Sequence, residues 1–291
     1  MAVSANVSAA VGMVCEAFLY GVYCVLFITS IVILFKRDRV SHRVILVANC
    51  LLFATSTAHF ATVFNHFYIA LEHSPFSEFE DETPELMGAN LLSSVVNLLG
   101  DLLLVYRCWL VWGKNFYVIV LPLLTALGGF GCILPIPSLV LSINPISQVP
   151  PAEIVPLTTA GYALPLCTNI MVTGLIAGRL WYLSRIPIVD EYGKPAMLKI
   201  AAGRRPMMLI IESGALYMVI QLIFVVLVAI QNSAEALLSY AGTQIYGIAS
   251  ALIIIRVGLG ISPEETVPMT HMKFWSQSQD TTGVRSVTVG T

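Results

Sequence analysis

The chain has 291 residues, of which 57% are hydrophobic and 11% are charged, and its net charge at pH 7 is −2. Soluble domains carry about 25% charged residues, so this chain has too few polar side chains to cover a surface that faces water. The composition excludes a soluble globular protein and predicts an all-α polytopic membrane protein.

The apolar residues are concentrated in segments long enough to cross a bilayer, for which a helix needs about 20 apolar residues. We expect one transmembrane domain over residues 1–261, built as a seven-helix bundle of the receptor-like kind. Its spans are predicted at about 12–35, 44–71, 86–112, 116–141, 157–183, 207–231 and 241–261. The remaining residues, 262–291, include ten Ser or Thr and few apolar side chains, which predicts a mobile cytosolic tail.

The segment ahead of the first span contains no Lys or Arg. A cleaved signal peptide begins with a basic region, so we expect the first span to remain in the mature protein. The triplet Asn6-Val7-Ser8 is an N-glycosylation sequon on the predicted outer tail. Asn6 is therefore a candidate glycosylation site.

The connecting segments alternate in charge, and this alternation predicts the orientation. The first loop, KRDRVSHR at 36–43, contains four Lys or Arg, whereas the segment 72–85 contains six acidic residues and no base. The alternation continues, so that all fifteen Lys and Arg fall on one side of the membrane. Because basic residues accumulate on the cytosolic side, we expect the N-terminus outside and the C-terminus in the cytosol.

The third span carries a polar stripe. Asn90, Ser94, Asn97 and Asp101 follow one another in steps of four, three and four residues, which places them on one face of a helix. Since a polar face avoids lipid, we expect this span to lie at the centre of the bundle.

The fourth and fifth spans contain prolines that are expected to kink them, which favours a cavity between them. These are Pro122, Pro135, Pro137 and Pro165. Glycines are expected to mark close helix contacts, because membrane helices associate through small residues. The candidates are Gly128, Gly129, Gly131, Gly174, Gly178 and Gly247.

Four charged residues within the spans are predicted to share a layer about 9–10 Å from the cytosolic face. They are Asp101, Arg179, Glu212 and Arg256. A charge inside the bilayer needs a partner or a neutral form, so we expect the acids to pair with the bases. Three roles fit such a layer: a structural lock, a switch that opens the cytosolic face, or a proton relay.

A second polar group is expected nearer the outside. Glu16 lies in the first span, and His59 and His66 lie seven residues apart on one face of the second. These side chains either satisfy one another or line an outer ligand cavity, to which Asn97 would contribute.

Metal and cofactor sites are not expected. Two histidines on one helix do not make a zinc or haem site without further ligands, and the last span has neither His nor Lys, which removes a retinal Schiff base. None of the six cysteines has CxxC spacing. We expect them to pack as small apolar residues.

Three blocks of the chain resemble a large family of fungal, mushroom-type seven-span integral membrane proteins. The blocks are DLLLVYRCWLVWGKNFYVIVLP (101–122), IIESGALY (210–217) and YGIASALIIIRVGLGIS (246–262). The resemblance implies a seven-helix fold and a fungal membrane, and it implies no agreed ligand or reaction.

Two classes of function fit these features. The first is a receptor-like or sensory protein of the plasma membrane or endomembrane, with membrane lipids, a small lipophilic ligand and a cytosolic signalling partner as its expected partners. The second is an intramembrane enzyme of the terpene cyclase kind, with Glu16 or Asp101 as the acid, or a carrier, in either case serving a fungal specialised-metabolite pathway. A nucleic-acid partner is not expected.

Overall fold

The computed structural model describes residues 5–35, 40–73, 83–141, 154–185, 214, 217–230, 232 and 234–256. These residues form helices and turns, with no strand among them. The helices are α1 (Ala5–Phe35), α2 (Val40–His73), α3 (Pro84–Val111), the short 3₁₀ helix η2 (Phe116–Val118), α4 (Val120–Ile133), α5 (Ile136–Leu141), α6 (Ile154–Arg185) and α8 (Glu235–Arg256). A shorter apolar helix, Tyr217–Ala229, lies between α6 and α8 in the chain.

Among the described residues, six helical segments are long and apolar enough to cross a membrane. They correspond to α1, α2, α3, α4 with α5, α6 and α8. Large apolar side chains lie on the outer faces of these helices, such as Phe18, which is 73% exposed. The predicted all-α polytopic membrane protein is confirmed. The seventh predicted span, 207–231, begins outside the described residues, and within it the structure describes the helix Tyr217–Ala229.

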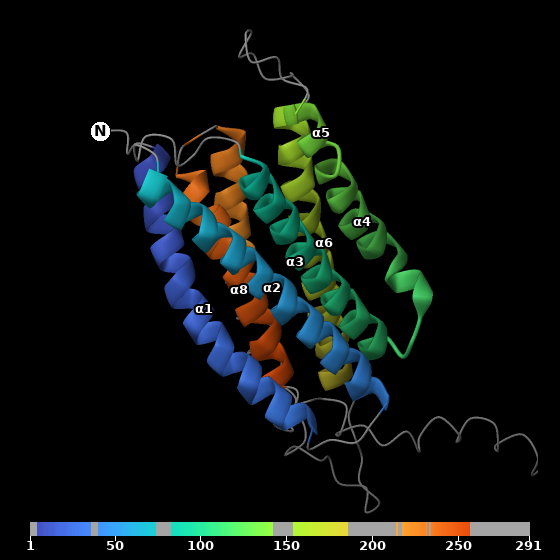
Figure 1. Cartoon of the computed structure of the whole chain (residues 1–291). Coiled ribbons are helices and arrows are strands. Elements are labelled where there is room, and N and C mark those ends of the chain that lie inside the picture. The colour runs from blue at the N-terminus through green and yellow to red at the C-terminus, as the bar shows by residue number, and fades with distance from the viewer. Residues whose placement is uncertain are drawn as a thin grey trace, which may run out of the picture.

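Figure 1 shows the helices packed side by side as an elongated bundle, with α1 at one edge and α4 at the other. α1 packs against α8 and α2, and α4 packs against α6. α3 packs against α2, α4, α6 and α8, which confirms the prediction that this helix is central. α1, α3, α6 and α8 all begin at the end of the bundle where the N-terminus lies (Figure 1).

Local signals in the sequence explain where α3 begins and ends. Thr83 caps the helix by accepting a hydrogen bond from the Leu86 backbone N–H at 3.2 Å, and a proline follows it at the first helical position. After Val111 the chain leaves the helix through two residues with positive φ, Gly113 at 65° and Lys114 at 66°. This left-handed turn satisfies the last carbonyl groups of the helix and turns the chain toward α4.

The predicted fourth span is interrupted rather than continuous. α4 ends at Ile133, and a turn at Leu134 and Pro135 separates it from α5. Proline lacks the backbone N–H that would continue the hydrogen-bond ladder, which accounts for the break at this position. In α6 the helix continues through Pro165.

The glycines divide into two groups. A Cβ atom at Gly129 would lie 2.7 Å from Pro165 Cδ, and one at Gly247 would lie 2.5 Å from the Tyr23 ring, so both glycines are needed for close packing. For Gly131, Gly174 and Gly178, no atom of the described residues lies within 4 Å of such a Cβ. The prediction that those three mark close contacts is therefore wrong for the described part of the chain.

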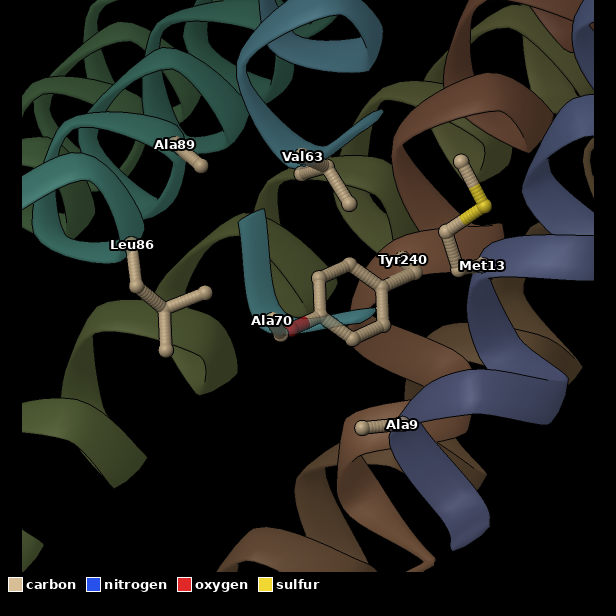
Figure 2. Packing of buried hydrophobic residues seen from close by; sticks show 7 residues of the cluster. All are labelled: Ala9, Met13, Val63, Ala70, Leu86, Ala89 and Tyr240. Carbon is tan, nitrogen blue, oxygen red and sulfur yellow. The ribbon is translucent and has the colours of Figure 1, made fainter. Parts of the chain in front are cut away.

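An apolar cluster at the N-terminal end of the bundle joins four helices. Figure 2 shows the Tyr240 ring of α8 between residues of α1, α2 and α3. Its partners are Ala9, Met13, Val63, Ala70, Leu86 and Ala89. The cluster holds the start of α8 against its neighbours and so fixes one wall of the pocket described next.

Candidate functional site

One pocket between the described helices has a cavity of about 310 Å³. It lies between α3, α4 with α5, α6, the Tyr217–Ala229 helix and α8, toward the end of the bundle where α3, α6 and α8 begin. We call it the outer pocket. Its walls are mostly apolar, with Leu91, Ile133, Val155, Phe224 and Val228 among them.

A few polar side chains converge on the outer pocket. Asn90 comes from α3, Thr158 and Tyr162 come from α6, and Glu235 and Ser239 come from α8. Glu235 and Ser239 are four residues apart and therefore share one face of α8. Apolar walls with a small number of polar groups are the usual character of a small-molecule site.

The sequence pointed to only one of these polar residues, Asn90, as part of the stripe on α3. The spacing of Glu235 and Ser239 at the start of α8 was an available signal. Tyr162 carried no local signal, because only the packing of α6 against α3 and α4 brings it into the pocket.

A second, much smaller cavity lies deeper in the bundle, and Tyr162 and Ile133 line both. Its volume is about 10 Å³, which is the room that one water molecule needs. Ser94, Asn97 and Asp101 of the α3 stripe line it. We call it the Asp101 cavity. The stripe therefore runs from the outer pocket, at Asn90, to this cavity.

Asp101 is 1% exposed, and neither of its carboxyl oxygens has a hydrogen-bond partner among the described residues. Asn97, by contrast, accepts a hydrogen bond from the Tyr217 hydroxyl at 3.0 Å. The Tyr217 ring packs edge-on against Tyr246 of α8, with 4.9 Å between the ring centroids. Asp101 thus lies close to aromatic and hydroxyl groups but is bonded to none of them.

Glu16 has a different environment on the α1 side of the bundle. Its Oε1 atom lies 2.8 Å from His59 Nδ1 and accepts a hydrogen bond from Gln244 Nε2 at 2.9 Å. Ser56 donates to Gln244 Oε1 at 3.5 Å. These four side chains are buried and join α1, α2 and α8. We call them the Glu16 network.

Further polar pairs connect the same group of helices. Asn49 of α2 donates to Ser30 of α1 at 2.8 Å, and the hydroxyls of Ser93 on α3 and Thr243 on α8 lie 2.8 Å apart. Between helices in a membrane, such bonds supplement close packing. The α1, α2, α3 and α8 side of the bundle is therefore cross-linked by side-chain hydrogen bonds.

The four residues predicted for an outer cavity do not form one site. Glu16 and His59 lie within hydrogen-bond distance of each other. His66 lies 3.4 Å from Thr83 Oγ1, and Asn97 lines the Asp101 cavity. Neither Glu16, His59 nor His66 lines a pocket among those described. Seven residues of helix separate the two histidines by about 10 Å, so one carboxylate cannot reach both.

The predicted ionic layer is described only in part. Arg179 lies over the Trp112 and Tyr182 rings, at 5.3 and 5.9 Å from their centroids, and among the described residues it does not pair with Asp101. A guanidinium placed over aromatic rings in this way is held by cation–π attraction. Glu212 and the Arg256 side chain lie outside the described residues, as do the Asn6 side chain and the tail 262–291.

The arrangement offers an apolar pocket with convergent polar groups and, beneath it, a buried acid beside a water-sized cavity. The described residues contain no cluster of three or more His, Cys, Asp or Glu that could hold a metal ion. Comparisons of the chain with protein-family models, curated proteins and solved structures return no match.

Proposed function

We propose that the protein is a receptor-like or sensory seven-span membrane protein that binds a small lipophilic ligand in the outer pocket. The observation that carries this proposal is the pocket itself, with about 310 Å³ of room between five helical elements. Pockets for small molecules begin at about 300 Å³ and combine apolar walls with a few polar groups. A ligand that contacts several helices at once favours one arrangement of the bundle over another, which is the basis of a receptor response.

The lining residues indicate the chemistry of the ligand. Most of its surface would contact aliphatic and aromatic side chains such as Val155 and Phe224. The Glu235 carboxylate and the Asn90 amide oxygen accept hydrogen bonds, and the Tyr162 and Ser239 hydroxyls can donate or accept. The pocket therefore suits a lipophilic molecule that carries one or two hydrogen-bond donors.

The seventh span and the orientation belong to the same proposal. The Tyr217–Ala229 helix is apolar and lies within the predicted span 207–231, and its side chains Phe224 and Val228 line the outer pocket with those of the longer helices. Because all fifteen Lys and Arg are on one side of the predicted topology, the outer pocket would face away from the cytosol. By the resemblance, the membrane is a fungal plasma membrane or endomembrane. The basic inner loops would bind the headgroups of membrane lipids and contact a signalling partner.

Epitope tags test the orientation. Tags after Ala2 and at Asn232 should be detected on intact cells or from the lumen, whereas a tag within 186–202 should require permeabilisation. An external signal from the 186–202 tag would contradict the proposed orientation.

Access to the outer pocket can be tested without knowing the ligand. Ser239→Cys places a thiol in the pocket, and it should react with a membrane-impermeant thiol reagent applied from the outer side. The matched control is Ser93→Cys, which lies on the α3–α8 interface but does not line the pocket. If Ser239→Cys reacts no faster than Ser93→Cys, the pocket is not accessible and the proposal fails.

Compounds that slow the labelling of Ser239→Cys are candidate ligands. They should also raise the melting temperature of the purified protein, and Ser239→Trp should abolish that rise by filling the pocket. Val25→Trp, which adds the same ring on the lipid-facing side of α1, should not. Candidate compounds that leave melting unchanged in the unsubstituted protein would contradict a binding site.

One observation favours the enzyme as a second candidate. Asp101 is a buried acid beside a cavity that shares Tyr162 with the outer pocket, and acid-initiated chemistry needs an acid held in an apolar site. Chromatography of the compounds recovered after incubation, with tandem mass spectrometry of each peak, distinguishes the two functions. A receptor returns its ligand unchanged, whereas a cyclase or isomerase returns an isomer of the same mass.

A further inference from the structure

The carboxyl group of Asp101 has no partner in a part of the protein where charge is costly. Asp101 lies on the central helix α3 with 1% of its surface exposed, and both carboxyl oxygens lack a hydrogen bond to any described residue. An ionised group within a bundle in the bilayer needs compensation, which a basic side chain, a proton or a bound cation can supply.

The described basic side chains do not compensate this charge. Arg107 lies six residues further along α3, which is about 9 Å along the helix axis, and Arg179 is placed over Trp112 and Tyr182. The Arg256 side chain lies outside the described residues, so for the described part of the chain a proton and a bound cation remain as compensation.

The Asp101 cavity has room for a small cation. A proton on Asp101 requires no additional room, yet the chain leaves about 10 Å³ beside the carboxyl group, enough for one particle of the size of water. A water molecule would fill this room without balancing the charge. A small cation meets both requirements, as does a proton on Asp101 with a water molecule beside it, and only the cation would make the stability depend on which salt is present.

The other groups around the cavity offer oxygen atoms, which hard cations prefer. The Ser94 hydroxyl donates its proton to the Asn90 carbonyl at 2.9 Å, so that its oxygen lone pairs remain for a ligand. Asn97 Oδ1 accepts one hydrogen bond, from Tyr217, and has a second lone pair. Tyr162 adds a phenol oxygen to the lining.

We propose that Asp101 binds a single Na⁺ ion in this cavity, with the oxygens of Asn97 and Ser94 as further ligands. A monovalent ion balances one carboxylate, whereas a divalent ion would leave a buried positive charge. Na⁺ is the smaller of the two common monovalent metal ions, which suits a cavity with room for only one water-sized particle. The site goes beyond the proposed ligand pocket. A bound cation leaves no acidic proton on Asp101. The cation site therefore argues against the enzyme alternative, in which Asp101 is the acid.

The test is the melting temperature of the purified protein in NaCl, KCl and N-methylglucamine chloride at matched ionic strength. At ten times its dissociation constant, Na⁺ should raise the melting temperature by about 3 °C relative to N-methylglucamine, which is too large for the cavity. K⁺ should have a smaller effect. Asp101→Asn should abolish the Na⁺ response, whereas Glu16→Gln, which changes an acid that already has two partners, should keep it.

A second variant covers the case in which Asp101→Asn does not fold. Ala126 lines the cavity and is buried, so Ala126→Val should fill the room for the ion while Asp101 remains, and it too should abolish the response. Equal melting temperatures in the three salts, or a K⁺ effect as large as that of Na⁺, would overturn the proposal. A Na⁺ response that survives in both Asp101→Asn and Ala126→Val would overturn it as well.

Discussion

Glu16 and Asp101 are both acids buried in the same bundle, and they differ in what surrounds them. Glu16 is 0% exposed, and its Oε1 atom lies within hydrogen-bond distance of His59 on α2 and Gln244 on α8. Asp101 is 1% exposed and receives no hydrogen bond from the described residues, although it lies on the helix with the most neighbours around it. Burial alone therefore does not reveal the role of an acid in a membrane bundle.

The difference separates a structural region from a region with room for other molecules. On the α1, α2 and α8 side, Glu16, His59 and Gln244 are hydrogen-bonded to one another, and the helices pack closely around Gly247, although the buried Tyr23 hydroxyl has no partner among the described residues. On the α3, α4 and α6 side lie the outer pocket and the Asp101 cavity. Paired polar groups stabilise a bundle, whereas an unpaired one in a cavity is a candidate for binding.

The largest effect is expected from Glu16→Ala. Removing this carboxyl group leaves His59 and Gln244 buried without their shared partner, and each buried polar group that loses its hydrogen bond costs about 1–3 kcal/mol. The free energy of unfolding in detergent measures this cost, with the lipid-facing Val14→Ala as control. A loss no greater than that of the control would show that the Glu16 network is not structural.

Gly247→Ala should have the next largest effect. The added methyl group would lie 2.5 Å from the Tyr23 ring at the α1–α8 contact, and overpacking of this kind costs about 1–3 kcal/mol. Gly174→Ala in α6 is the matched control, because no described atom lies within 4 Å of its added methyl group. Thermal unfolding of the two variants should therefore differ in sign, since alanine favours a helix by up to about 1 kcal/mol where it fits. Equal melting temperatures would mean that the α1–α8 contact adapts.

A smaller effect is expected between Ser93 and Thr243. Their hydroxyls lie 2.8 Å apart in the interior between α3 and α8. A double-mutant cycle with Ser93→Ala and Thr243→Val should give a coupling free energy of about 0.6 kcal/mol, which is typical of a hydrogen bond between membrane helices. A coupling of zero would limit the paired region to the Glu16 network.

The smallest effect is expected from Asp101→Asn in buffer without Na⁺ or K⁺. The substitution keeps the shape of the side chain and removes no hydrogen bond to the described residues, so the free energy of unfolding should change by less than the coupling of about 0.6 kcal/mol expected for Ser93 and Thr243. A loss as large as that of Glu16→Ala would show that Asp101 has a partner in the folded protein, and the contrast between the two acids would disappear.

Several features follow from local properties of the chain and could be predicted from it. Apolar length determines which segments cross a membrane, and α3 at Pro84–Val111 lies close to the predicted 86–112. The spacing of Asn90, Ser94, Asn97 and Asp101 identified the face of α3 that lies in the interior, because one helix alone determines which side chains share a face. Pro135 lies at the break between α4 and α5 for an equally local reason, its missing N–H.

The partners of the buried residues were decided by the packing of the helices. Glu16 and Gln244 are 228 residues apart in the chain, and no local sequence pattern near either residue indicates the other as its partner. Gly174 and Gly247 both lie in predicted spans, yet among the described residues only Gly247 of the two lies close to another helix, because the rotation of each helix about its axis determines which face is in contact. The same rotations place Tyr162 beside the α3 stripe and Asp101 next to a cavity, with no base among the described residues bonded to it. Such contacts join residues far apart in the chain, and only the assembled bundle determines them.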